Sequence, residues 1–237
     1  MPPPSEPVLE VRGLEAWYGE SHVLHGIDFD VHEGELVTLL GRNGAGRTST
    51  LKAILGLTDR REGSARVWGV EAVGLPPHRV ARLGIGYCPE ERGIYAGLSV
   101  EENLMLPPKL QSSGLPVEEL YAMFPNLKER RKTQGTHLSG GEQQMLALAR
   151  ILRTGAMLLL LDEITEGLAP VIVQALGQAL AMLKAKGFTI VLVEQNFRFS
   201  APLADRHYVV EHGRVAAVVP REELQNRMDL LHEYLGV

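Results

Sequence analysis

The chain has 237 residues, of which 45% are hydrophobic and 22% are charged, and its formal net charge is −5. This length allows one substantial hydrophobic core, and the lack of a basic excess argues against a protein that binds nucleic acid through the phosphate backbone. The longest uninterrupted apolar run, Ala156–Leu161, is far shorter than the roughly 20 residues that span a bilayer. The single cysteine, Cys88, excludes an internal disulfide and is typical of a reducing compartment.

The first elements along the chain read as a short lead-in followed by strands. Residues 1–7 lack the basic and apolar parts of a secretory signal, so we interpret them as a disordered lead-in. Alternating apolar and polar residues predict strands over Val8–Val11 and Leu24–Val31, in an antiparallel sheet. From Leu36 onward, apolar strands alternate with helical segments, which predicts a largely parallel sheet covered on both faces. These strands are Leu36–Leu40, Ile85–Cys88, Met157–Leu161, Thr189–Val193 and Tyr208–Val210.

A glycine-rich segment follows the strand at 36–40 and precedes a helix that begins near Thr48. Successive backbone N–H groups of such a segment can surround a phosphate at the N-terminus of the helix. The hydroxyl of Thr48 is placed to bind Mg²⁺, and Ser49 can add a phosphate contact. We therefore predict a phosphate-binding loop. Its residues are Gly41, Arg42, Asn43, Gly44, Ala45, Gly46, Arg47 and Thr48.

The helical patterns in the middle of the chain interrupt the alternation of strands and helices. We interpret residues 91–155 as a helical subdomain inserted in the α/β core, with a break at Pro107-Pro108. Near its end, Ser139, Gly140, Gly141 and Glu142 precede the predicted helix Gln143–Leu152. This segment is either a second anion site at a helix N-terminus or only an N-cap.

Two carboxylates, Asp162 and Glu163, follow the apolar strand at 157–161. Because ligands bind beyond the carboxyl ends of parallel strands, these residues and Gly41 are expected at one edge of the sheet. Asp162 can hold Mg²⁺, and Glu163 can act as the general base for an attacking water. Two exposed acids at the end of a strand would be the simpler interpretation if the phosphate-binding loop were absent.

The last third of the chain contains two helical patterns. Apolar residues recur at helical spacing after Pro170, so we expect a helix that packs on the sheet. A similar spacing over residues 221–235 predicts an amphipathic terminal helix. Together these patterns predict one α/β domain over residues 8–237.

The phosphate-binding loop, the segment Leu138–Gln144 and the strand that ends in Asp162-Glu163 occur in a fixed order. With this order the chain resembles the ATP-binding subunits of ATP-binding-cassette (ABC) transporters over nearly its whole length. The resemblance implies a P-loop NTPase core with a mostly parallel sheet, an N-terminal antiparallel β subdomain and an inserted α-helical subdomain. It also implies ATP and Mg²⁺ as cofactors, ATP hydrolysis, and a dimer in which Ser139, Gly140, Gly141 and Glu142 face the γ-phosphate bound by the other subunit.

The resemblance assigns further residues one by one. Tyr18 stands where the family stacks an aromatic ring on adenine, although Trp17 beside it leaves this choice open. Glu90 stands where many cassettes have a glutamine that contacts Mg²⁺, and a carboxylate there can contact a metal-bound water. Gln195 stands where many cassettes have a switch histidine. An amide can hydrogen-bond to phosphate and water but cannot shuttle a proton, so a positioning role is expected.

Two residues depart from the family pattern. Arg47 replaces the usual lysine of the loop, and its wide planar guanidinium is expected to impair hydrolysis more than nucleotide binding. Ile164 replaces the usual proline after Glu163, which changes the stiffness of the backbone there. Because Asp162 and Glu163 are both present, we favour an active ATPase. A regulatory subunit whose hydrolysis is impaired by Arg47 remains the alternative.

One subgroup of the family, the ATPases of bacterial branched-chain amino-acid importers, shares several of these variations. The resemblance implies a second ATPase subunit, either identical or a sister chain, and permease subunits that contact the region Glu90–Leu106. The solute would touch the permeases and an extracytoplasmic solute-binding protein, so this chain does not identify it. The expected location is cytoplasmic, on the inner face of the membrane. A soluble cassette ATPase acting on nucleic acid or ribosomes is the competing hypothesis, but such proteins usually carry two cassettes. The segments that carry the resemblance to the amino-acid importer ATPases are Pro89-Glu90, Leu98–Leu104, Glu166–Pro170 and Val193–Asn196.

Overall fold

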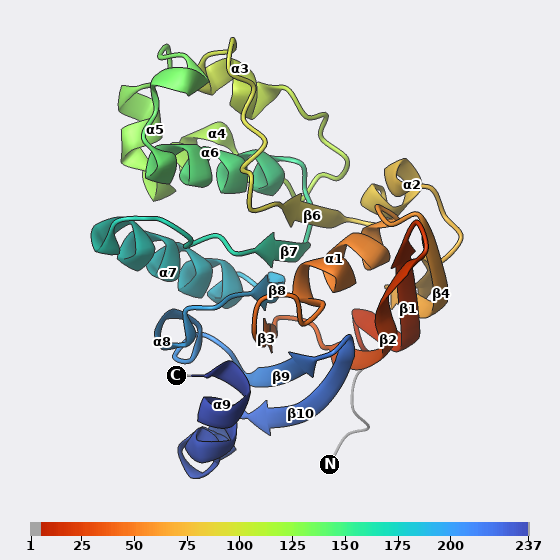
Figure 1. Cartoon of the computed structure of the whole chain (residues 1–237). Helices are drawn as coiled ribbons and strands as arrows, with labels where there is room; N and C mark the ends of the chain where they lie inside the picture. The colour runs from red at the N-terminus through yellow and green to blue at the C-terminus, as the bar shows by residue number, and fades with distance from the viewer. Residues whose placement is uncertain (1–5, 237) are drawn as a thin grey trace.

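The computed structural model describes residues 6–236, so most of the predicted lead-in, residues 1–5, lies outside the described residues. Two β-sheets and the helices that cover them form the structure, which confirms the predicted α/β fold (Figure 1). The smaller sheet is antiparallel with strand order β2-β1-β4-β5. Its strands are β1 (Leu9–Tyr18), β2 (Ser21–Val31), β4 (Arg60–Val67) and β5 (Val70–Glu71).

The larger sheet has strand order β10-β9-β3-β8-β7-β6. All neighbouring pairs are parallel except β9 with β10. Three of the predicted strand ranges, 36–40, 85–88 and 189–193, coincide with β3, β6 and β8. The remaining strands are β7 (Leu158–Asp162), β9 (Arg206–Glu211) and β10 (Arg214–Pro220).

The central strands are buried on both faces, as their continuous apolar sequences require. Along β7, Leu158 and Leu160 pack with the smaller sheet, whereas Leu159 and Leu161 pack with the helices on the other face. Helix α1 (Arg47–Leu55) lies on the first side, and α6 (Gly140–Arg153) and α7 (Pro170–Ala185) lie on the second. The sheet is therefore the middle layer of the core, and its edge positions the loops that follow the strands.

A helical segment connects β6 to β7, although these two strands are direct neighbours in the sheet. It contains α3 (Val100–Met105), α4 (Val117–Met123), α5 (Pro125–Glu129), a 3₁₀ helix (Gly135–His137) and α6. These helices lie together at the top of Figure 1, in yellow and green. This is the region that the sequence predicts as an inserted subdomain; its independence as a unit remains a prediction.

Short helices complete the fold: α2 (Pro77–Ala81), α8 (Phe197–Ser200) and α9 (Met228–Leu235). The tail predicted as one amphipathic helix over 221–235 differs, because a 3₁₀ helix, Arg221–Arg227, precedes α9. The 3₁₀ helix buries none of its residues, whereas Leu231 of α9 packs on Leu40 and Val209 of the sheet. Within residues 6–236, no helix is both long enough and apolar enough to cross a bilayer.

Candidate functional site

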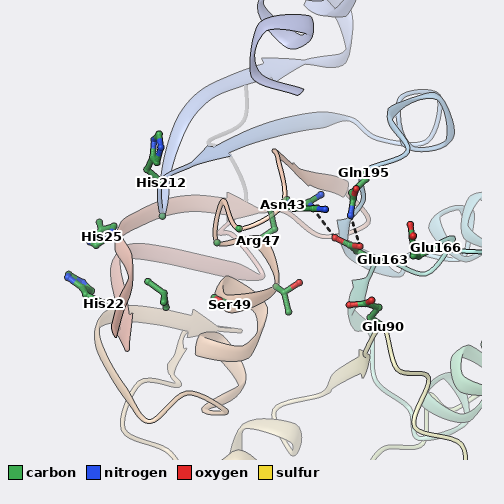
Figure 2. A pocket seen from close by; sticks show the side chains of 15 residues that line it. His22, His25, Asn43, Arg47, Ser49, Glu90, Glu163, Glu166, Gln195 and His212 are labelled. Carbon is green, nitrogen blue, oxygen red and sulfur yellow. Dashed lines mark hydrogen bonds and ion pairs between the residues drawn. The ribbon is translucent and has the colours of Figure 1, made fainter. Parts of the chain in front are cut away.

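A pocket of about 710 Å³ opens above the glycine-rich loop. The loop contributes Asn43, Gly44, Gly46 and Arg47, and α1 adds Thr48 and Ser49. Figure 2 shows that the remaining walls differ, with carboxylates at one end and imidazoles at the other. The carboxylate end has Glu90, Glu163, Glu166 and Gln195, and the imidazole end has His22, His25 and His212, with Val23 and Gly213 beside them.

The strand order explains why residues far apart in the sequence meet at the carboxylate end. Strand β8 lies between β3 and β7, and all three run in the same direction. The glycine-rich loop follows β3, Glu163 follows β7 and Gln195 lies two residues after β8. Parallel neighbours deliver these segments to one edge of the sheet, as the sequence predicts.

The glycine-rich loop depends on backbone conformations and close approaches that favour glycine. Gly41 has φ 151°, and a Cβ there would clash with the carbonyl oxygen of Val210 on β9. Gly46 has φ 110°, and a Cβ there would lie 2.9 Å from the Leu24 side chain on β2. Glycine at these positions keeps the loop against both sheets and starts α1 at Arg47, so the first N–H groups of α1 face the pocket.

Arg47 is almost fully buried, with 4% of its surface exposed, and connects the loop to the end of β7. Its Nη2 donates to Glu163 Oε1 at 2.9 Å and to Asn43 Oδ1 at 3.3 Å. Burial lowers the pKa of Arg47, and the nearby Glu163 carboxylate opposes this shift. Nη1 of Arg47 is buried and has no hydrogen-bond partner among the described residues. A phosphate oxygen in the pocket would satisfy this donor.

Glu163 is held from both sides. One carboxylate oxygen accepts from Arg47, and the other accepts from Gln195 Nε2 at 2.9 Å, as the dashed lines of Figure 2 show. Its backbone has φ 47°, a conformation that costs a residue with a Cβ about 1–2 kcal/mol and is often found at functional sites. The backbone N–H of Glu163 donates to Val193 O at 2.9 Å, which ties this conformation to β8.

Asp162 lies beneath the pocket wall, at the end of β7. Thr48 Oγ1 donates to Asp162 Oδ1 at 2.9 Å, and the Tyr87 hydroxyl donates to Asp162 Oδ2 at 3.2 Å. Burial raises the pKa of the Asp162 carboxyl, because few charges compensate its ionised form. A hydroxyl next to a buried carboxylate is an all-oxygen donor set of the kind that Mg²⁺ prefers, so these residues fit that ion.

Three more carboxylates lie at or behind the carboxylate end of the pocket. Glu90 and Glu166 line the wall opposite the loop. Glu194 lies behind Gln195, where it accepts hydrogen bonds from Thr165 N at 3.1 Å and Thr165 Oγ1 at 2.9 Å. Burial raises the pKa of Glu194 to about 7 despite these hydrogen bonds. The carboxylate end therefore contains acids whose environments differ.

The imidazole end is formed by the β1–β2 hairpin and the turn between β9 and β10. His25 N donates to Gly213 O at 2.9 Å, and Gly213 N donates to Ala45 O at 2.8 Å. These two hydrogen bonds join β2, the turn and the glycine-rich loop. His212, with φ 47°, precedes Gly213 in the turn and faces the pocket mouth. Backbone hydrogen bonds thus fix this part of β2 and the turn relative to the loop.

Not every predicted residue lines the pocket. Gly41 and Ala45 support the loop, and Ala45 instead borders a neighbouring cavity of about 230 Å³. Tyr18, at the end of β1, is also absent from the pocket wall and is 36% exposed. The ring that approaches the pocket from this hairpin belongs to His22, which stacks on Trp17. The adenine contact predicted for Tyr18 therefore remains a prediction.

The segment Ser139–Glu142 lies at the N-terminus of α6, outside the pocket of this chain. Ser139 N donates to Glu142 Oε2 at 2.8 Å, and Glu142 N donates to Ser139 Oγ at 3.3 Å, which is a capping box. Glu142 also pairs with Arg130 at 3.0 Å. Gly140 and Gly141 pack closely on Arg92 and Ile172. The N-cap expected from the sequence is present, and the anion contact remains a prediction.

Several pocket residues escape sequence reasoning. His22, His25 and His212 have no motif spacing, and we would assign them to ordinary surface or core positions from the sequence alone. These three residues line the same pocket because the Gly213 turn packs on β2. This contact joins segments almost 190 residues apart in the sequence. Among residues 6–236, no group of three or more His, Cys, Asp or Glu side chains is arranged to hold a metal ion. The imidazoles are therefore not explained by a metal site.

The family is established by comparison with known proteins. The sequence profile described as "ABC transporter" matches residues 24–166, which contain the glycine-rich loop and the Asp162-Glu163 pair. The chain belongs to the ABC transporter family. A high-affinity branched-chain amino acid transport ATP-binding protein, BraG of Pseudomonas aeruginosa, is 38% identical over 97% of this chain and 100% of its own length. ABC cassettes of this type hydrolyse ATP, and this chain is an ATP-binding subunit of that kind.

Two further comparisons show which other proteins this ABC subunit is similar to. A lipopolysaccharide export system ATP-binding protein, LptB of Haemophilus influenzae, is 31% identical over 97% of both chains. A solved structure of the ATP-binding subunit of an ABC transporter has a TM-score of 0.80 and 28% identity, over 97% of this chain and 100% of that one. The fold is thus that of an ABC cassette, and the relatives include subunits named for branched-chain amino acid transport and for lipopolysaccharide export.

Proposed function

We propose that this ABC subunit powers the import of branched-chain amino acids or of similar small polar solutes. The observation that carries this proposal is the 38% identity to BraG over 97% of this chain and the full length of BraG. Identity to LptB, a protein named for export, is lower at 31%. The variations Glu90, Gln195 and Glu166–Pro170, usual in the amino-acid importer subgroup that this chain resembles, support the same assignment.

The contacts at the carboxylate end support a division of roles in ATP hydrolysis. Glu163, next to the loop, accepts the proton of the attacking water as general base. Gln195 donates to Glu163 and holds its carboxylate in position. Thr48 and Asp162 would hold Mg²⁺, with Glu90 near enough in the pocket wall to assist them. When bound, this ion neutralises charge on the phosphate oxygens.

The ion pair between Arg47 and Glu163 bears on whether this chain hydrolyses ATP. Its guanidinium occupies one oxygen of Glu163 at 2.9 Å, so the proposed base is neutralised in this conformation. A bound triphosphate would give Arg47 a stronger anionic partner and release Glu163. We favour an active ATPase because the carboxylates and Gln195 are in place. A regulatory subunit in which the ion pair persists is the alternative.

The position of Ser139–Glu142 supports a dimer. These residues lie outside the pocket formed by their own chain, at the N-terminus of α6. In the proposed dimer, N–H groups of this terminus face the γ-phosphate bound by a second ABC subunit. That subunit is either a second copy or a sister ATPase.

An exposed apolar surface on the helical segment supports contact with a permease. Tyr95, Met105 and Leu106, all within the predicted contact region Glu90–Leu106, are 54%, 49% and 48% exposed. Apolar side chains exposed in this way are typical of interaction surfaces. The chain would then sit on the cytoplasmic face of a bacterial membrane, and an extracytoplasmic solute-binding protein would contact the permeases rather than this subunit.

Co-expression with the candidate permeases tests the proposal. We expect the chain to co-purify with the membrane subunits and to drive ATP-dependent uptake of a branched-chain amino acid into vesicles. The matched control is Glu163→Gln, which should assemble equally well but drive no uptake. Assembly without uptake of any small polar solute would contradict the import assignment. Recovery of RNA or DNA in place of membrane proteins would favour the soluble cassette hypothesis.

A further inference from the structure

A buried carboxylate, Glu194, lies behind the Glu163–Gln195 pair and has no part in the roles described above. We infer that Glu194, in its ionised form, is a positioning residue that holds Glu163 and Gln195 in place for hydrolysis. Glu194 is 2% exposed and is not part of the pocket wall, so it acts through its neighbours rather than on the nucleotide. This inference rests on the proposed role of Glu163 as the general base.

Glu194 joins the loop after β8 to the loop after β7. Its Oε1 accepts from Thr165 N at 3.1 Å, and its Oε2 accepts from Thr165 Oγ1 at 2.9 Å. Oε2 also accepts from Asn196 N at 3.4 Å, so the carboxylate is bonded on both sides of Gln195 in the sequence. One buried side chain therefore ties together the two loops that supply Glu163 and Gln195.

The bond to Thr165 constrains Glu163, which lies two residues earlier in the chain. Both residues belong to a turn that Glu166 N closes by donating to Glu163 O at 3.2 Å. Glu163 has a positive φ of 47°, so this conformation depends on the contacts that hold the turn. On the pocket side, Gln195 donates to the Glu163 carboxylate (Figure 2). Behind the turn, Thr165 donates to Glu194, so the two loops are joined at the front and at the back.

The charge of Glu194 decides whether all these donors find an acceptor. An ionised carboxylate only accepts, whereas a protonated one adds a further donor among them. Burial is the main cause that brings the pKa of Glu194 to about 7, and the Glu163 charge adds to it. Arg47 is the cation that faces Glu194: burial lowers the pKa of Arg47, and the Glu194 charge is among those that oppose this. The bridge between the loops is therefore complete only as pH rises through about 7.

The pH dependence of steady-state ATP turnover tests the inference, with Mg²⁺ and at protein concentrations that allow dimerisation. Glu194→Gln keeps the size of the side chain but cannot ionise. We expect its kcat at pH 8 to lie about tenfold below that of the native chain with KM for ATP unchanged, because a misplaced base slows hydrolysis without weakening binding. At pH 6 the two proteins should have nearly equal kcat, because the native carboxylate is then mostly protonated.

Variants of Thr165 test the same contact from the other loop. Thr165→Val removes the hydroxyl donor and keeps the shape of the side chain, so kcat at pH 8 should fall about threefold. Thr165→Ser retains the hydroxyl and should keep native turnover. Adding Thr165→Val to Glu194→Gln should cost little beyond Glu194→Gln alone, because both changes act through one contact.

The matched control is Glu71→Gln on β5. The Glu71 carboxylate also accepts from a hydroxyl, Ser64 Oγ, and from two backbone N–H groups, those of Ala65 and Val73. Glu71 lies outside the pocket and outside the two loops. Glu71→Gln should lower the free energy of unfolding but leave the pH profile of turnover as it is in the native chain.

The outcomes separate this inference from the proposed function. If the native chain does not hydrolyse ATP, or if Glu163→Gln hydrolyses it as well as the native chain does, the proposed base is wrong and the inference falls with it. If Glu163→Gln is inactive but Glu194→Gln follows the native pH profile, the inference alone is wrong. A loss in Glu194→Gln that is the same at pH 6 and pH 8, or that appears only in KM, would assign Glu194 a purely structural role and overturn the inference.

Discussion

The two ends of the pocket are built in different ways. At the carboxylate end, Glu163 and Gln195 follow parallel strands, so their position is set by the order β3-β8-β7. At the imidazole end, His22 and His25 lie on an antiparallel hairpin and are placed by cross-strand stacking and by the Gly213 turn. The comparison teaches that one end of a pocket can be encoded in short motifs, whereas the positions of the side chains at the other end depend on tertiary contacts. The predictions below test this division.

The largest effect is expected at the carboxylate end. Glu163→Gln removes the proposed general base, so steady-state ATP turnover should fall by a factor of about 10²–10⁴. The amide preserves the shape of the side chain, and ATP binding should change little. The neighbouring change Glu166→Gln should reduce turnover far less, because no contact joins Glu166 to Arg47 or Gln195 in the described structure. Equal losses in the two variants would show that the base has been misassigned.

Glu194, behind the carboxylate end, should make stability depend on pH. Burial raises its pKa to about 7, so the folded chain keeps a proton that the unfolded chain loses above its ordinary pKa. This contribution to stability is complete below that ordinary pKa and is lost as pH rises to about 7. Relative to Glu194→Gln, the native chain should lose up to about 3 kcal/mol between pH 5 and 8, measured by urea unfolding. Parallel stability curves for the two proteins would contradict this account.

Two identical helix caps separate a structural role from a functional one. Ser99 and Ser139 each form a capping box with a glutamate three residues later. Either Ser→Ala change should lower the free energy of unfolding by about 1 kcal/mol. Only Ser139→Ala should also lower turnover, by about tenfold, under conditions that allow dimerisation. A loss of turnover in Ser99→Ala of the same size would indicate a general effect of destabilisation.

The smallest effect is expected from Arg47→Lys. A lysine retains the charge but cannot span Asn43, Glu163 and a phosphate with one planar group. Weakening the Arg47–Glu163 pair should raise turnover about threefold. A rise from no measurable turnover would instead identify the native chain as a regulatory subunit. A fall would show that the guanidinium itself is needed.

Short motifs and apolar runs predict most of the fold. Strands β3, β6 and β8 are fully apolar or nearly so, and their bounds follow from the sequence. Strand β4 cannot be predicted in this way, because its sequence RREGSARV is charged and buries only Ala65 and Val67. The tail is predicted as helical, but the sequence spacing does not distinguish its 3₁₀ half from α9.

The candidate site, like the fold, is predicted from the sequence only in part. The glycine-rich loop, Asp162 and Glu163 are predictable because they lie at or directly after the end of a strand, whereas Gln195 is assigned from the family resemblance. The Arg47–Glu163 pair at 2.9 Å is not, because it joins side chains 116 positions apart. Nor is the stack of His22 on Trp17, because it depends on the hairpin register.

The most direct test of the account is a crystal structure of Glu163→Gln with ATP and Mg²⁺, since this variant should bind without hydrolysis. The account predicts the triphosphate along the glycine-rich loop, with its γ-phosphate beside residue 163 and Arg47 bonded to the phosphates. A triphosphate in the opposite direction, with its terminal phosphate near His22 and away from residue 163, would contradict it.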